Sequence, residues 1–82
     1  MASYHYVYIL QSDGSPTHFY VGQTTDLKAR LAKHNEGGTP YTANHRPWSF
    51  KTAIAFTDPI NAARFERYLK TSSGRAFSRR HL

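Results

Sequence analysis

Tyr-Val-Tyr-Ile-Leu at positions 6–10 and Phe-Tyr-Val-Gly at positions 19–22 flank the turn sequence Ser-Asp-Gly-Ser-Pro at positions 12–16. Both runs are rich in the aromatic and β-branched residues that are enriched in strands. The segment between them holds glycine and proline, the residues most typical of turns. Together the three segments predict an antiparallel hairpin.

The predicted hairpin has two chemically different faces, because successive side chains of a strand point to opposite sides. One face carries Val7, Ile9, Phe19 and Val21, and the other carries Tyr6, Tyr8, Tyr20 and Gly22. Folding about Gly14 pairs Tyr8 with Tyr20, Ile9 with Phe19, and Val7 with Val21. Gly22 then leaves room opposite Tyr6 for a backbone or a ligand. The first face is suited to a core, and the second presents a pair of tyrosines.

Length and charge limit the class of protein. A chain of 82 residues buries about 60% of its unfolded surface and predicts a single domain over 1–82. Eleven Lys and Arg against five Asp and Glu give a net charge of +6, which favours a polyanionic partner, nucleic acid first. Six of the basic residues crowd the last nineteen positions: Arg64, Arg67, Lys70, Arg75, Arg79 and Arg80.

Location and redox environment follow from what the sequence lacks. It contains no cysteine, which excludes disulfides and thiolate zinc sites and is consistent with a reducing compartment. No apolar run approaches the roughly 20 residues that span a bilayer, and the N-terminus has no signal-peptide pattern. We expect a cytoplasmic protein without membrane contact.

The rest of the chain predicts three helices and a third strand. A helix over 26–34 is capped near Asp26 and ends before Gly37. Positions 36–47 are expected to form a loop, and 48–57 a strand with one buried face. A second helix starts at Asp58 and ends at 72–74, and 75–82 forms a short basic helix. The predicted fold class is α/β, more specifically α+β, with a small, mainly antiparallel three-stranded sheet flanked by helices in the order ββαβαα.

One carboxylate is free for chemistry. Asp13 precedes a turn glycine, Asp26 and Asp58 stand at helix starts, and Glu36 adjoins a glycine loop, all positions where acids serve the backbone. Glu66 lies inside a predicted helix, where a solvated residue paired with the lysine four positions later is the ordinary alternative. A single carboxylate suffices for one Mg²⁺, or Mn²⁺, that takes its other ligands from water and substrate phosphate.

The chain resembles the GIY-YIG nuclease superfamily, in particular its small stand-alone members and the N-terminal catalytic domain found in a bacterial-type excinuclease. The first signature reads Tyr-Val-Tyr at positions 6–8 and the second Tyr-Val-Gly at positions 20–22. An arginine follows ten residues after Tyr20, and Glu66 stands where the family has its metal carboxylate. Two features depart from the family pattern: Tyr6 replaces the glycine of the first signature, and no Asn or Gln follows Asn61.

The resemblance implies a metal-dependent endonuclease with DNA favoured over RNA as its substrate, and a place in DNA repair. It implies that Tyr8 and Tyr20 belong to the catalytic face, Arg30 contacts phosphate, His34 assists, and Glu66 holds the ion. A tyrosine is the favoured general base on resemblance, and His34, whose ordinary pKa is near 6.5, is the alternative. The candidate nucleic-acid contacts are Lys28, Arg46, Arg75 and Arg79. No target-selecting module fits in the chain, so a protein partner is expected to supply target choice.

Two other functional classes remain open. A binding module or adaptor with the same fold and no turnover predicts salt-sensitive binding without Mg²⁺-dependent nicking. A protein-interaction domain is disfavoured, because so basic a surface suits only an acidic partner.

Overall fold

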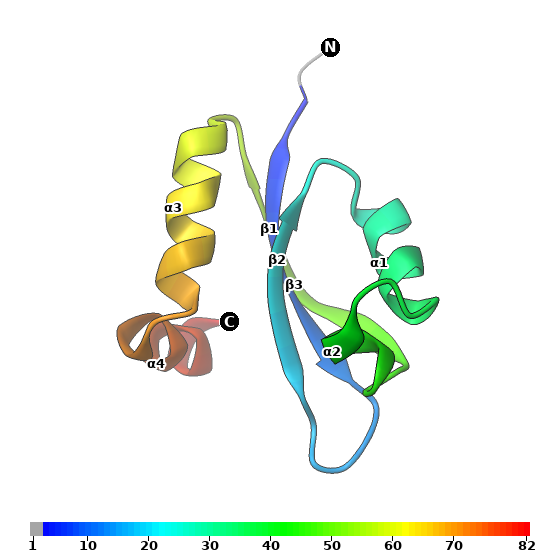
Figure 1. Cartoon of the computed structure of the whole chain (residues 1–82). Helices are drawn as coiled ribbons and strands as arrows, with labels where there is room; N and C mark the ends of the chain where they lie inside the picture. The colour runs from blue at the N-terminus through cyan, green and yellow to red at the C-terminus, as the bar shows by residue number, and fades with distance from the viewer. Residues whose placement is uncertain (1–2) are drawn as a thin grey trace.

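The computed structural model describes residues 3–82 and shows an antiparallel sheet between two layers of helices (Figure 1). The elements are β1 (His5–Ser12), β2 (Phe19–Thr24), α1 (Leu27–Asn35), α2 (Pro40–Ala43), β3 (Trp48–Phe56), α3 (Pro59–Leu69) and α4 (Ser72–His81). The strand order is β2-β1-β3, so β2 and β3 form the edges. Helices α1 and α2 lie on one face of the sheet, and α3 and α4 on the other (Figure 1). The predicted α+β class is confirmed, with α2 as an addition inside the expected loop.

The predicted cross-strand pairs are wrong by two residues. Tyr8 lies opposite Gly22, Ile9 opposite Val21, and Leu10 opposite Tyr20. The Ser12 and His18 backbones close the hairpin through a bond of 2.9 Å, so the loop is centred one residue beyond Gly14. A shift by an even number of residues keeps every side chain on its predicted face. Gly22 therefore faces the Tyr8 ring and leaves no open space opposite Tyr6.

The two faces of the sheet carry separate apolar clusters. Val7 and Ile9 pack with Ala62 and Leu69 beneath α3. On the other face, buried Tyr8, Leu10 and Trp48 pack with partly buried Tyr20, Leu27, Leu31 and Phe50. Phe19 departs from the prediction of a core residue: it is 52% exposed at the start of β2.

Strand β3 contributes to both clusters, which corrects the expectation of one buried face. A β-bulge interrupts its pairing with β1, so that Ile9 pairs with Thr52 and Leu10 with Phe50. The extra residue, Lys51, shifts the alternation. Trp48 and Phe50 thus join the cluster beneath α1, whereas Phe56 joins the cluster beneath α3.

Local sequence signals explain where the helices begin and end. The Asp26 side chain accepts a bond from the Ala29 backbone, and Asp58 does the same for Ile60 ahead of Pro59. Gly37 follows α1 with φ +88, a conformation that favours glycine. No helix within residues 3–82 combines the length and the apolar character needed to cross a membrane.

The C-terminal region begins its last helix earlier than predicted. Residues 72–74 start α4 instead of ending α3, because the Thr71 hydroxyl caps the Gly74 backbone N–H. A Cβ at Gly74 would lie 1.8 Å from the Tyr68 carbonyl oxygen. This close approach turns α4 sharply from α3 and brings it across the lower end of the sheet (Figure 1).

Candidate active site

Tyr8 occupies the centre of the face beneath α1. Its side chain is 1% exposed and crosses from the central strand toward the edge strand β2. A Cβ added at Gly22 would lie 2.5 Å from the Tyr8 hydroxyl oxygen and 3.1 Å from the Tyr20 ring. The glycine of the second signature therefore makes room for the tyrosine of the first.

His34 connects this phenol to α2. Its Nε2 lies 2.9 Å from the Tyr8 hydroxyl, and its Nδ1 lies 3.0 Å from Thr42 Oγ1. A neutral imidazole has one donor and one acceptor. The phenol is the stronger acid and donates to Nε2, which leaves Nδ1–H to donate to Thr42. Thr42 in turn shares a hydrogen bond of 2.6 Å with the Thr39 hydroxyl.

His34 is buried, which corrects its placement on a solvated helix flank: it is 1% exposed. Thr42 is completely buried and was not among the residues singled out from the sequence. Its signal was weak, because a threonine in an expected loop gives no indication of facing a histidine eight positions earlier. The short helix α2 makes that contact.

Burial and neighbouring charge hold both groups in their neutral forms. Burial, with the nearby Tyr20 phenol, raises the pKa of Tyr8 to about 12, and the Glu66 carboxylate adds to the rise. The Arg30 guanidinium opposes it through its charge and its polar contact with the phenol. Burial lowers the pKa of His34 below its ordinary 6.5, and the cations Arg30 and Lys33 act in the same direction.

Tyr20 and Arg30 complete this side of the site. The Tyr20 ring lies 6.4 Å from the Tyr8 ring and 4.8 Å from the imidazole of His34, centroid to centroid. Arg30 stands one turn before His34 on α1 and acts on the pKa of both Tyr8 and His34.

Glu66 reaches the same region from the opposite layer. It lies on α3, and its Oε1 accepts a bond of 3.0 Å from the Gln23 amide on β2. Its Oε2 accepts a bond of 2.9 Å from Lys70, the pair expected for an ordinary helix residue. The Glu66 charge also contributes to the pKa of Tyr8. Because β2 is an edge strand, groups from both helical layers meet around it.

Gln23 is a residue that the sequence analysis left without a role. It follows Gly22 directly and faces the α3 layer, since it lies opposite Val7. Its amide stands beside Glu66, where the family pattern has a late asparagine that this chain lacks. Strand alternation gave its face, but the position of α3 was needed to bring Glu66 to it.

Glu66 and Gln23 are suited to one divalent cation of low protein-ligand number. No cluster of three or more His, Cys, Asp or Glu side chains that fits a metal occurs within residues 3–82. Mg²⁺ is commonly held by one or two carboxylates, with water and substrate phosphate as further ligands. The Glu66 side chain is 19% exposed and open to such an ion.

The predicted nucleic-acid contacts fall into two separate groups. Lys28 is exposed on α1, on the same helix as Arg30. Arg46 is exposed but bonds the Ala43 carbonyl at 3.0 Å. Arg75 and Arg79 lie on α4, across the sheet, where they line a pocket.

Comparison with known proteins identifies the fold and its signatures. The GIY-YIG catalytic domain family matches residues 4–80. The chain belongs to the GIY-YIG family. Tyr8, Gly22, Arg30 and Glu66 thus have the local setting of this family's domain, assembled around strand β2.

Relatives of this GIY-YIG chain include small proteins and one larger enzyme component. The UPF0213 protein BH0048 of Halalkalibacterium halodurans is 41% identical over 73 residues, which cover 87% of this chain and 74% of that protein. Its solution NMR structure matches with a TM-score of 0.56 over 93% of this chain and 80% of the other. Structure-specific endonuclease subunit SLX1 of Scheffersomyces stipitis is 38% identical over 71 residues, 78% of this chain and 21% of that protein.

Proposed function

We propose that this GIY-YIG domain is a metal-dependent endonuclease that hydrolyses phosphodiester bonds in nucleic acid, with DNA favoured over RNA. The observation that carries the proposal is the meeting of Arg30 and Glu66 at the Tyr8 phenol from opposite helical layers. The family match and the similarity to an endonuclease subunit support it. The net charge of +6 supports a polyanionic substrate.

In the proposed reaction, the buried pair of Tyr8 and His34 manages the proton of the attacking water. A phenol with a pKa of about 12 is a poor base as an anion at neutral pH, because almost none of it is ionised. Tyr8 instead accepts the water proton as its own proton passes to His34 Nε2, 2.9 Å away. The neutral imidazole is able to receive it because its pKa lies below 6.5.

Arg30 and Glu66 have the complementary roles. Arg30 neutralises charge on the non-bridging phosphate oxygens. Glu66, with Gln23 beside it, would hold one Mg²⁺ or Mn²⁺. Such an ion, when bound, supplies positive charge that stabilises the leaving oxygen.

The test is a cleavage panel over duplex, branched, flapped and single-stranded DNA and RNA with Mg²⁺, Mn²⁺ or EDTA. Glu66→Gln keeps the shape of the side chain and is expected to lower the rate by about a hundred-fold or more. Glu36→Gln removes an exposed carboxylate at the C-terminal end of α1 and is the matched control. Cleavage that persists in EDTA, or at wild-type rate in Glu66→Gln, would refute the proposal.

One observation favours a second candidate, a binding module without turnover. Glu66 is already paired with Lys70 and Gln23, so its carboxylate is satisfied without an ion. A module of this kind would bind nucleic acid with strong salt dependence and show no cleavage under any metal condition in the panel. A protein partner that supplies target choice is compatible with both candidates, and for the nuclease we propose such a partner.

A further inference from the structure

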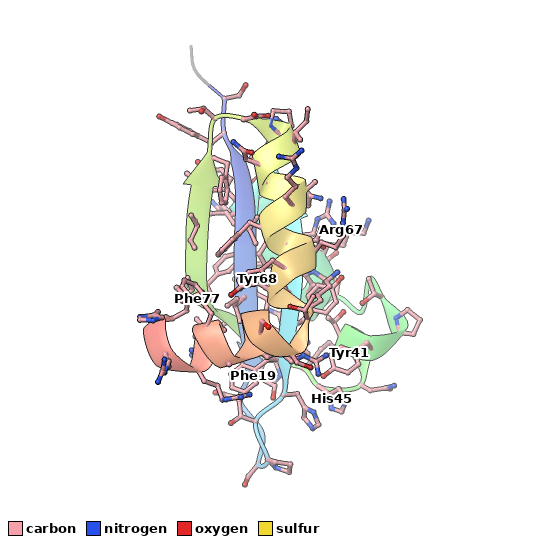
Figure 2. All side chains as sticks on the ribbon, turned by 90° about the vertical axis from the view of Figure 1, so that its left-hand side faces the viewer. Phe19, Tyr41, His45, Arg67, Tyr68 and Phe77 are labelled. Carbon is pink, nitrogen blue, oxygen red and sulfur yellow. The ribbon has the colours of Figure 1, made fainter. Side chains whose placement is uncertain are left out.

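The larger pocket of the molecule lies across β2 from the tyrosine site, between the sheet and α4. It has a volume of about 530 Å³, within the range of small-molecule sites. Ile9, Val21 and Leu69 form an apolar floor, and Phe19 stands at its side. Figure 2 shows Phe19 directly below α4 at the lower end of the sheet.

Cations surround the apolar floor. Lys51, Lys70, Arg75 and Arg79 all line the pocket, and no carboxylate of residues 3–82 is among its lining groups. Lys51 Nζ lies 5.9 Å from the centre of the Phe19 ring. A flat apolar slot rimmed by positive charge matches a ligand with an aromatic body and anionic groups.

Two residues connect this pocket to the proposed catalytic site. Tyr20 lines the pocket and also packs against Tyr8. Lys70 lines the pocket and bonds Glu66 at 2.9 Å. A chain with its phosphate beside Glu66 would therefore reach the pocket with a neighbouring unit around the β2 edge.

We infer that this pocket binds one unpaired nucleotide next to the bond that is cut, with its base stacked on Phe19. The flanking phosphates contact Lys51, Arg75 and Arg79. Duplex DNA keeps its bases inside the helix and places only phosphates at the rim, so the pocket selects strands with an accessible base. The position of the nucleotide relative to the cut rests on the proposed nuclease function, but its binding does not.

Binding is measured with wild-type protein in EDTA, where no cleavage interferes. The probes are a single-stranded 15-mer carrying 2-aminopurine and the same sequence as a duplex. Phe19→Ala is expected to weaken single-strand binding by about five-fold or more, since one stacked base contributes that much, and to leave duplex binding unchanged. Phe19→Trp should restore binding. Ile60→Ala, which trims another exposed apolar side chain at 62% exposure, is the control.

The cationic rim is tested by Arg79→Gln against Arg80→Gln on the same helix, because Arg80 does not line the pocket. NMR titration with AMP, ribose 5-phosphate and inorganic phosphate separates base from phosphate recognition. Larger shifts with AMP at Phe19 and Leu69 than with the two base-free ligands support the proposal. Equal shifts with all three, or unchanged single-strand binding in Phe19→Ala, overturn it. Loss of this selectivity with cleavage intact rejects the pocket alone, whereas intact binding without cleavage under any metal condition rejects the nuclease alone.

Discussion

The Tyr8 hydroxyl lies 2.9 Å from His34 Nε2, and both side chains are 1% exposed. A tyrosine from the first strand and a histidine from the first helix are thus locked together away from water. Neither side chain has the solvated environment typical of its residue type. The pair is positioned by the bare backbone of Gly22 on one side and by the Thr42 hydroxyl on the other.

Removing the Tyr8 hydroxyl should abolish turnover without changing the fold. Tyr8→Phe takes away the atom that accepts the water proton, and we expect cleavage to fall by about a hundred-fold or more. Tyr20→Phe removes a hydroxyl that makes no contact with His34 Nε2, and should cost less. Rates measured against pH decide between them, and a tyrosine base is rejected if both variants cleave like the wild type.

Burial of His34 predicts a stability that declines in mild acid. Its pKa is lowered in the folded protein, so the unfolded chain binds the proton more readily below about pH 6.5. Its contribution is therefore complete above that pH and is lost as the pH falls, by at most about 1.4 kcal/mol per pH unit. Urea unfolding from pH 7.5 to 5 should show a shallower decline for His34→Gln than for the wild type. His81→Gln removes an exposed imidazole and is the control.

Thr42 is expected to act as a positioning residue for His34. Thr42→Val keeps the side-chain shape but leaves the buried Nδ1–H without an acceptor, which costs about 1–3 kcal/mol of stability. The imidazole can then change tautomer and lose its acceptor toward Tyr8. ¹⁵N chemical shifts of His34 report the tautomer directly. Thr42→Ser should restore both the shifts and the pH–rate profile, and failure of Ser to rescue would assign Thr42 to packing alone.

Gly22 should be far less tolerant of a methyl group than Gly14. A Cβ at Gly22 would lie 2.5 Å from the Tyr8 hydroxyl, whereas a Cβ at Gly14 meets nothing within 4 Å. Gly22→Ala is expected to destabilise the protein by about 1–3 kcal/mol, as overpacking does, and to displace Tyr8. Gly14→Ala should change stability by about 0.5 kcal/mol or less. Equal urea midpoints for the two variants would contradict the packing of Tyr8 on Gly22.

The sequence predicts the elements of this fold well because their signals are local. Asp26 and Asp58 cap helices, Gly37 ends one, and the alternation in β1 and β2 assigns Tyr8 and Val7 to their faces. The errors concern relations that a local pattern does not encode. The hairpin register depends on where the Ser12 backbone bonds, and the second face of β3 depends on one bulge.

The candidate site is predictable in its residues and less so in their environment. The family signatures pointed to Tyr8, Arg30 and Glu66, but burial of His34 follows from α2, which the glycine-rich loop did not predict. Gln23 became relevant once α3 placed Glu66 against β2. The expectation that nearby positive charge lowers the pKa of Tyr8 is reversed, because burial outweighs Arg30.

The contact between Lys70 and Glu66 places a protein cation where a metal ion is proposed to bind. The ammonium lies 2.9 Å from Oε2 and is 52% exposed, so the pair adds about 0.5 kcal/mol or less to stability. Lys70→Met removes a positive charge that opposes Mg²⁺ and frees one carboxylate oxygen. We therefore expect the Mg²⁺ concentration for half-maximal cleavage to fall several-fold, with unfolding almost unchanged.

Direct Mn²⁺ binding followed by electron paramagnetic resonance separates this effect from substrate binding, since Lys70 also lines the nucleotide pocket. Arg64→Met is the matched control, because it removes an exposed cation from the same helix two residues away from Glu66. Residues two apart on a helix do not share a face. If Lys70→Met binds Mn²⁺ no more tightly than Arg64→Met does, the ion does not share the Glu66 carboxylate with Lys70, and the metal site must be sought elsewhere.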